Sequence, residues 1–171
     1  MSGFLRFIGI LNAAVWCGSA IFLVVGLPAV FSAELKQLLT PAGVGFAAEA
    51  IVARFFVVQY WCGVIALAHL AAEWLYVGRS RSLDAGLVVV MLAIALAGGL
   101  WLQPKMQRLH KLHYFGQTAE QRELAGKTFG AWHGASESAN LLVIAGLIAY
   151  LWRVSRPEEY SPPGIFSKIR S

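Results

Sequence analysis

The chain has 171 residues, of which 58% are apolar and only 13% are charged, and its mean hydropathy is +0.63. A soluble globular domain is about one quarter charged, so this composition excludes an ordinary cytosolic enzyme, a disordered chain and a coiled coil. The net charge of +5 suits loops that face anionic lipid headgroups, and no basic stripe with interleaved aromatic residues indicates a nucleic-acid partner. We therefore expect an integral membrane protein.

Four apolar segments are long enough, or nearly so, for a membrane-spanning helix of about 20 residues. The predicted spans are residues 4–31, 55–77, 86–101 and 136–152, and the third continues to Pro104. The first segment is longer than the apolar core of a signal peptide, which is about 7–15 residues. The expected fold class is all-α, an integral membrane four-helix bundle.

An even number of spans places both termini on one membrane face, which we call side A, and residues 32–53 and 104–133 on the other, side B. The basic residues divide evenly between the two sides. Those of side A lie in short segments close to span ends, which favours termini in the cytoplasm of a bacterial inner membrane. Residues 1–156 form the predicted membrane domain, and the polar, proline-rich tail at 157–171 is expected to fray.

The side B connection between the third and fourth spans has a helical pattern. Apolar residues recur at helical spacing in residues 105–115 and 118–132, and Gly116 separates the two segments. We expect a helical hairpin that extends spans three and four beyond the membrane. Residues 32–53, which contain Pro41, Gly43 and Gly45, are expected to form a loop at the membrane interface.

The tripeptide Trp-Cys-Gly occurs at residues 16–18 and again at residues 61–63, at similar depths in spans one and two. Small residues at equal depth, here Gly18 and Gly63, indicate close helix packing, as does the pair Gly98 and Gly99. A site built from the thiols of Cys17 and Cys62 is the alternative.

Ionisable residues inside a span are costly and are therefore candidates for a functional site. His133 and Glu137 lie one helical turn apart, and His110 and His113 lie on the extension of span three. Histidine and carboxylate are common metal ligands, so these four residues are the candidate metal site. The alternative is structural, with Ser136, Glu137 and His133 satisfying local polar groups where the hairpin meets the membrane.

His69 and Glu73 repeat the same spacing in span two. His69 lies about 20 Å from His133 along the membrane normal, so the two cannot share one metal or one haem. Each remains a candidate cofactor ligand at a separate site. His69 would otherwise belong to a buried polar network with Asn12 and Asn140, with Glu73 nearer the surface, or serve in a proton or ion relay.

No complete catalytic constellation is present, because the sequence lacks a glycine-rich phosphate loop, a Cys-x-x-Cys pair and a nucleophile elbow. We therefore expect no enzymatic activity. The favoured function is an accessory or structural subunit that packs against other membrane-protein subunits, redox or photosynthetic ones included, and against lipids. The alternatives are a subunit that binds haem, chlorophyll or a metal ion, and a small efflux or transport component.

Several motifs resemble the transmembrane protein 205-like family, which in bacteria is a four-helix membrane domain of unknown function. They are Trp101-Leu102-Gln103-Pro104-Lys105, His133-Gly134-Ala135-Ser136 followed by Asn140-Leu141, and Pro28 with Phe31. The resemblance extends to about Arg156 and implies the four-helix fold. The family is distantly similar to copper-resistance D and protoporphyrinogen-oxidase-like membrane proteins, which implies metal or haem handling. The haem-linked proteins carry a histidine early in the first span, and this chain has none there.

Overall fold

The computed structural model describes residues 2–77 and 81–156. The predicted tail at 157–171 and residues 78–80 of the side A turn lie outside the described residues. The helices, in chain order, are α1 (Ser2–Gly26), η1 (Leu27–Phe31), α2 (Ala33–Leu38), α3 (Pro41–Val77), α4 (Ser82–Ala97), η2 (Gly98–Leu102), α5 (Gln103–Phe115) and α6 (Ala119–Ser155).

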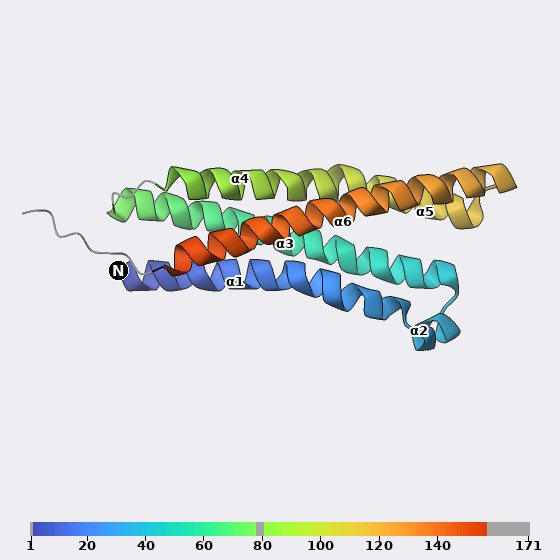
Figure 1. The fold of residues 1–171 in the computed structure, drawn as a ribbon, viewed down its shortest axis with the longest axis horizontal. Coiled ribbons are helices and arrows are strands. Elements are labelled where there is room, and N and C mark those ends of the chain that lie inside the picture. Colours follow the sequence, from blue (N-terminus) through green and yellow to red (C-terminus); the bar gives the residue numbers. More distant parts are fainter. Residues whose placement is uncertain (1, 78–80, 157–171) are drawn as a thin grey trace, which may run out of the picture.

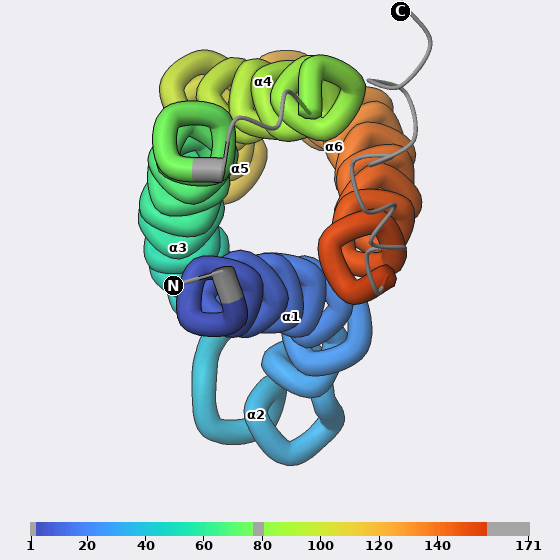
Figure 2. The backbone as a smooth tube through the Cα atoms, turned by 90° about the vertical axis from the view of Figure 1, so that its left-hand side faces the viewer, coloured from blue at the N-terminus to red at the C-terminus, as the bar shows by residue number. Residues whose placement is uncertain are grey.

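Four long helical rods run side by side along one axis (Figure 1), and the end-on view shows them at the corners of a square (Figure 2). In this square α1 packs on α3 and α6, and α4 packs on the same two helices. Four segments are long and apolar enough to cross a membrane: Gly3–Phe31, Pro41–Tyr76, Ser82–Phe115 and Ala119–Ser155. The predicted all-α bundle of four membrane-spanning helices is confirmed, and it indicates an integral membrane protein.

Span boundaries on side B differ from the sequence expectation. Residues 32–53 are not a loop, because α3 begins at Pro41 and continues through this segment. The hydroxyl of Thr40 accepts a hydrogen bond from the backbone N–H of Gly43 at 3.2 Å, which caps the start of α3. Proline, here Pro41, is well suited to the first helical turn. The predicted hairpin of spans three and four is confirmed: α5 ends before Gly116, and α6 begins at Ala119.

Ionisable residues mark the two ends of the apolar zone. They are Glu73, Asp84 and Arg153 at side A, and Arg54, Lys105 and His133 at side B. On each helix about 20 residues separate the two levels, which corresponds to about 30 Å, the thickness of a hydrocarbon layer. The side B ends of α3 and α6, together with α5, therefore extend beyond that layer.

A π-helical turn, η2, joins α4 to α5 without interrupting the rod. Here the N–H of Gln103 bonds to the carbonyl of Gly98, which makes room in the helix ahead of Pro104. Gly98 and Gly99 also allow α3 to approach closely, because a Cβ on Gly98 would lie 2.7 Å from the ring of Phe56. The expected role of this glycine pair in close packing is thus seen in the structure.

The two Trp-Cys-Gly copies are not equivalent. A Cβ on Gly63 would lie 2.7 Å from Leu92, so this glycine packs closely as expected, whereas Gly18 has no neighbour within 4 Å. Cys17 and Cys62 are both buried and free. Gly18 therefore faces outward and does not mirror Gly63.

A network of charged side chains joins three helices at side A. Asp84, the single aspartate of the sequence, forms ion pairs with Arg153 of α6 and, at 3.7 Å, with Arg81. Arg81 in turn lies 3.4 Å from Glu73 of α3. The side chain of Asp84 is only 2% exposed. A further bond, from the guanidinium of Arg6 to the carbonyl of Ser155 at 2.7 Å, connects α1 to α6 at the same end.

We predict that Asp84→Asn lowers the free energy of unfolding by roughly 3 kcal/mol, because it removes the buried carboxylate charge that Arg81 and Arg153 share. Unfolding of the purified protein in mixed detergent, followed by tryptophan fluorescence, measures the change. Glu120→Gln, an exposed carboxylate at the start of α6, is the control, with an expected loss below about 1 kcal/mol. Equal losses for the two variants would contradict a stabilising role of the network.

Candidate ligand-binding site

A cavity of about 990 Å³ lies at the side B end of the bundle. Small-molecule sites in proteins measure about 300–1,000 Å³, so this cavity is at the upper end of that range. Its walls come from α3, α5 and α6, from η1, and from the side B end of α4.

Three helices contribute one face each to the cavity. The contributing residues recur every three or four positions, which places them on a single side of each helix. They include Gly45, Glu49, Val52 and Phe56 on α3, Gln103, Met106, Gln107 and His110 on α5, and Phe129, His133, Ser136 and Asn140 on α6.

The lining changes in polarity with depth. Its inner part, at the level of Ile94, Ala95 and Val143, is mostly apolar and lies within the hydrocarbon zone, with Gln59 and Asn140 as polar side chains there. Its outer part, beyond the side B level of Arg54 and Lys105, contains Glu49, Gln107 and the histidines of α5. The cavity thus passes from a mostly apolar to a more polar environment across the membrane boundary.

The cavity lies between helices that diverge. Figure 1 shows α1 and α6 close together at the end that carries the N-terminus and far apart at the other end. At side B, η1 packs on α3 and α2, whereas α6 packs on α5. Pro28 and Phe31 of η1 and Leu141 of α6 nevertheless line the same cavity. Cavity-lining residues therefore lie on both η1 and α6, the two elements that diverge at this end.

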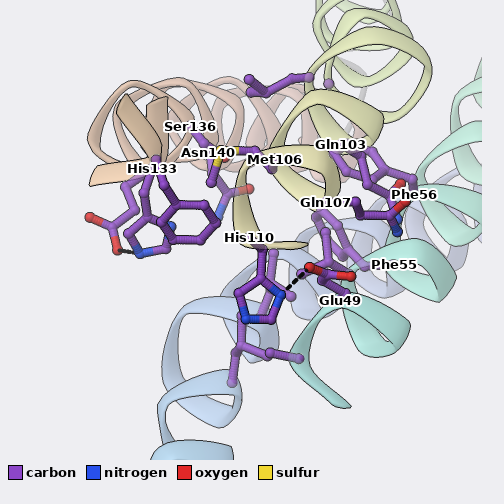
Figure 3. A pocket seen from close by; sticks show the side chains of 18 of the residues that line it. Glu49, Phe55, Phe56, Gln103, Met106, Gln107, His110, His133, Ser136 and Asn140 are labelled. Atoms are coloured by element: carbon purple, nitrogen blue, oxygen red, sulfur yellow. Dashed lines mark hydrogen bonds and ion pairs between the residues drawn. The ribbon is translucent and has the colours of Figure 1, made fainter. Parts of the chain in front are cut away.

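The best-defined polar contact in the cavity joins α5 to α3. Nδ1 of His110 lies 2.7 Å from a carboxylate oxygen of Glu49, and His110 is 7% exposed (Figure 3). The His110 ring also packs edge-on against Phe46 and Tyr114. No sequence pattern indicated this pair, because Glu49 lies in the segment that was expected to form a loop.

Three of the four histidines lie against a glycine of a neighbouring helix. A Cβ on Gly45 would overlap the ring of His110, one on Gly126 would lie 2.7 Å from His113, and one on Gly9 would lie 2.5 Å from His69. Each glycine therefore provides the space that an imidazole occupies. The His113 ring, placed against Gly126, has its Nδ1 3.0 Å from the carbonyl of Arg122.

His133 and Glu137 pair locally, as their spacing predicted, with 3.1 Å between Nε2 of His133 and the Glu137 carboxylate. Both side chains are more than half exposed. The His133 ring stacks on Phe129 of the preceding turn. This pair lies at the rim of the cavity and is separate from the His110–Glu49 pair.

The residues predicted to form one buried polar network are divided between the two ends of the bundle. Asn12 donates to the carbonyl of Cys62 at 2.9 Å, and Nε2 of His69 lies 2.8 Å from the carbonyl of Leu5 and 3.7 Å from Glu73. Asn140 and Ser136 instead line the side B cavity. Asn12, His69 and Asn140 are not joined, because Asn12 and His69 contact nearby backbone carbonyls and Asn140 lines the cavity.

The predicted metal ligands are also not gathered around one point. Within residues 2–77 and 81–156, no group of three or more His, Cys, Asp or Glu side chains is placed to hold a metal ion. His110 pairs with Glu49, His133 pairs with Glu137, and His113 lies against the carbonyl of Arg122, so the four proposed ligands belong to three separate contacts.

A haem or chlorophyll does not fit at His69. The His69 ring lies against α1 at Gly9, its Nε2 is in a hydrogen bond with the backbone carbonyl of Leu5, and its Nδ1 is buried. Neither ring nitrogen is accessible to a macrocycle without movement of α1.

Sequence reasoning missed the α5 stripe as a binding face. Gln103, Gln107, His110 and Tyr114 follow one another at spacings of three or four residues, and all line the cavity. That regular spacing of polar residues, directly after an apolar span, was the available signal.

We predict that Glu49→Gln lowers the free energy of unfolding by about 1.5–3 kcal/mol, because it removes the charge from a hydrogen bond within a largely buried pair. Glu123→Gln is the matched control, since its pair with Lys127 at 2.8 Å is about 70% exposed and is worth about 0.3–0.5 kcal/mol. Detergent unfolding of both variants provides the comparison. A loss for Glu49→Gln no larger than that of the control would contradict a stabilising His110–Glu49 pair.

Comparison with known proteins identifies a family but not an activity. A family model described as a domain of unknown function, DUF4149, matches residues 11–114, from α1 through most of α5. No curated protein and no solved structure matches the chain. The expectation of an uncharacterised membrane domain is supported, whereas the finer resemblance to transmembrane protein 205-like proteins stays a prediction. Because the match covers more than half of the sequence, the chain belongs to the DUF4149 family.

Proposed function

We propose that the protein binds an amphiphilic ligand in the side B cavity and receives it from the lipid bilayer. The observation that carries this proposal is the depth gradient of the cavity, which is mostly apolar inside the hydrocarbon zone and more polar at the headgroup level. A ligand with an apolar body and a polar head would match both parts, because apolar burial and hydrogen bonding would each occur where the lining provides them.

The divergence of η1 and α6 at side B supports entry from the membrane. An amphiphile already aligned in the bilayer has its head at the level of Gln107 and His110 and its chain at the level of Ile94 and Val143. Lateral movement would bring it into the cavity without exposing its chain to water. This route favours a membrane lipid or a lipid-like molecule over a water-soluble ligand.

The packing at the centre of the bundle favours ligand binding over transport of a ligand through the monomer. At the inner end of the cavity, the indole of Trp16 is fully buried and its N–H donates a hydrogen bond to the side-chain oxygen of Gln59. The side-chain nitrogen of Gln59 lies 3.4 Å from the hydroxyl of Ser19. Leu147 and Met91 fill the adjacent core. This packing closes the inner end of the cavity, so transport across the bundle would need a rearrangement that binding does not.

We predict that Ala139→Phe, which places a ring in the cavity, reduces ligand occupancy at least fivefold. Occupancy is measured in lipid nanodiscs by photolabelling with diazirine-bearing diacyl lipids that carry a hydroxyl, a phosphate or a trimethylammonium head. Adducts mapped by mass spectrometry should concentrate on cavity-lining peptides for at least one of these lipids.

Ala135→Phe is the control for this experiment, because Ala135 lies one turn earlier on α6, is exposed and does not line the cavity. It should leave labelling of the cavity unchanged. Adducts spread evenly over the outer faces of the bundle, with no difference between the two variants, would contradict the proposed function.

A second proposal keeps the expected role of an accessory subunit in a larger membrane complex. This proposal is supported by an exposed stripe on α1 in which large apolar side chains flank a glycine. The stripe consists of Phe4, Phe7, Leu11, Val15, Gly18, Phe22 and Val25. A glycine within an apolar stripe allows a neighbouring membrane helix to approach closely.

For this second role we predict that mild-detergent purification from native membranes recovers a stoichiometric membrane partner. Gly18→Leu should abolish recovery of the partner without destabilising the chain, because no atom lies within 4 Å of the added Cβ. Absorption spectra and metal analysis of the eluate test the cofactor alternative in the same experiment. A chain recovered alone from wild-type membranes would contradict the accessory role.

A further inference from the structure

Among the described residues, the polar end of the cavity contains carboxylates but no lysine or arginine. Within residues 2–77 and 81–156, the acidic residues that line it are Glu49 and Glu137, and its basic side chains are histidines. Lys105 belongs to the same helix as the polar stripe, yet it lies over the rings of Trp101 and Trp132 and does not line the cavity. A phosphate head would therefore meet no permanent positive charge on the cavity wall.

Both carboxylates are already engaged. Glu49 lies 2.7 Å from His110, and Glu137 lies 3.1 Å from His133. A cationic head would have to displace a histidine from a partner that is fixed on the protein. The carboxylates are thus poor candidates for holding a free cation.

Three amide side chains remain for the ligand. Gln103 and Gln107 of α5 and Asn140 of α6 line the cavity, and among the described residues none of them has a side-chain hydrogen bond. Figure 3 shows them on opposite sides of the His110 region. An amide both donates and accepts hydrogen bonds, so it matches hydroxyl and carbonyl oxygens without requiring charge.

We infer that the amphiphile has an uncharged head that bears hydroxyl or carbonyl oxygens, and that Gln103 and Gln107 bind this head. Asn140 lies deeper in the cavity, about 10 Å inside the level of His133. The inference rests on the proposed function and adds the ligand class to it. A hydroxyl head, as in a diacylglycerol, and a carbonyl head, as in a quinone with an alkyl chain, present this chemistry from two sources.

The test is competition for the cavity by ligands that share their chains and differ in their heads. Dioctanoylglycerol, dioctanoyl phosphatidic acid and a dioctanoyl trimethylammonium lipid compete with the photolabel that marks the cavity. We expect dioctanoylglycerol to compete at a concentration at least tenfold lower than either charged lipid. Decylubiquinone serves as the carbonyl arm, and whichever neutral ligand competes better identifies the source.

Gln107 variants test the assigned amide. Gln107→Leu should weaken competition by the neutral ligand about two- to tenfold, as the loss of one hydrogen bond predicts. Gln107→Arg should improve competition by phosphatidic acid several-fold, which a purely structural role would not produce. Gln121→Leu, an exposed amide outside the cavity, is the control and should change neither.

The outcomes separate the two proposals. If phosphatidic acid or the cationic lipid competes as well as dioctanoylglycerol, or if the Gln107 variants behave like Gln121→Leu, the inferred ligand class is overturned and the cavity remains a binding site. If no lipid labels the cavity in the first place, the proposed function fails and the inference fails with it. Selective competition by a neutral ligand, lost in Gln107→Leu, supports both.

Discussion

The buried Asp84 network at side A is the constraint on which the arrangement of the bundle depends. Asp84 pairs with Arg153 and Arg81, and Arg81 approaches Glu73, so that α3, α4 and α6 are held at one end. Charge pairs of low exposure tolerate little displacement, because loss of one partner leaves the other without compensation. At the same end the Arg6 guanidinium donates to the carbonyl of Ser155, which joins α1 to α6, and these two helices diverge toward the other end, where the cavity forms (Figure 1).

Glycines determine which polar groups reach the interior. The His110 ring occupies the space above Gly45 and from there bonds to Glu49, while His69 and His113 use Gly9 and Gly126 in the same manner. A side chain at any of these glycines would displace an imidazole from its partner. The same glycines therefore let neighbouring helices approach closely and provide space for the imidazole rings. This explains how the three histidines are accommodated inside a largely apolar bundle.

The cavity links this packing to the membrane. Its depth gradient arises because α3, α5 and α6 continue past the hydrocarbon layer, so that one continuous wall is mostly apolar at one level and more polar at the next. The π turn at Gly98–Leu102 contributes by carrying the rod past Pro104, which leaves Gln103 and Gln107 on the cavity side of α5. The proposed ligand, an uncharged amphiphile, would satisfy the hydrogen-bonding groups of this wall.

Composition and periodicity alone determined the membrane class, the four spans and the α5–α6 hairpin, since these follow from local apolar runs and from Gly116 as a break. The sequence also marked His69, His110 and His133 as costly residues that need partners. Only the tertiary structure decided which partners they have, because Glu49 is 61 residues from His110 and meets it only when α3 begins at Pro41. Helical spacing predicts contacts within one helix, as for His133 and Glu137, whereas contacts between helices depend on how the rods converge and diverge in space.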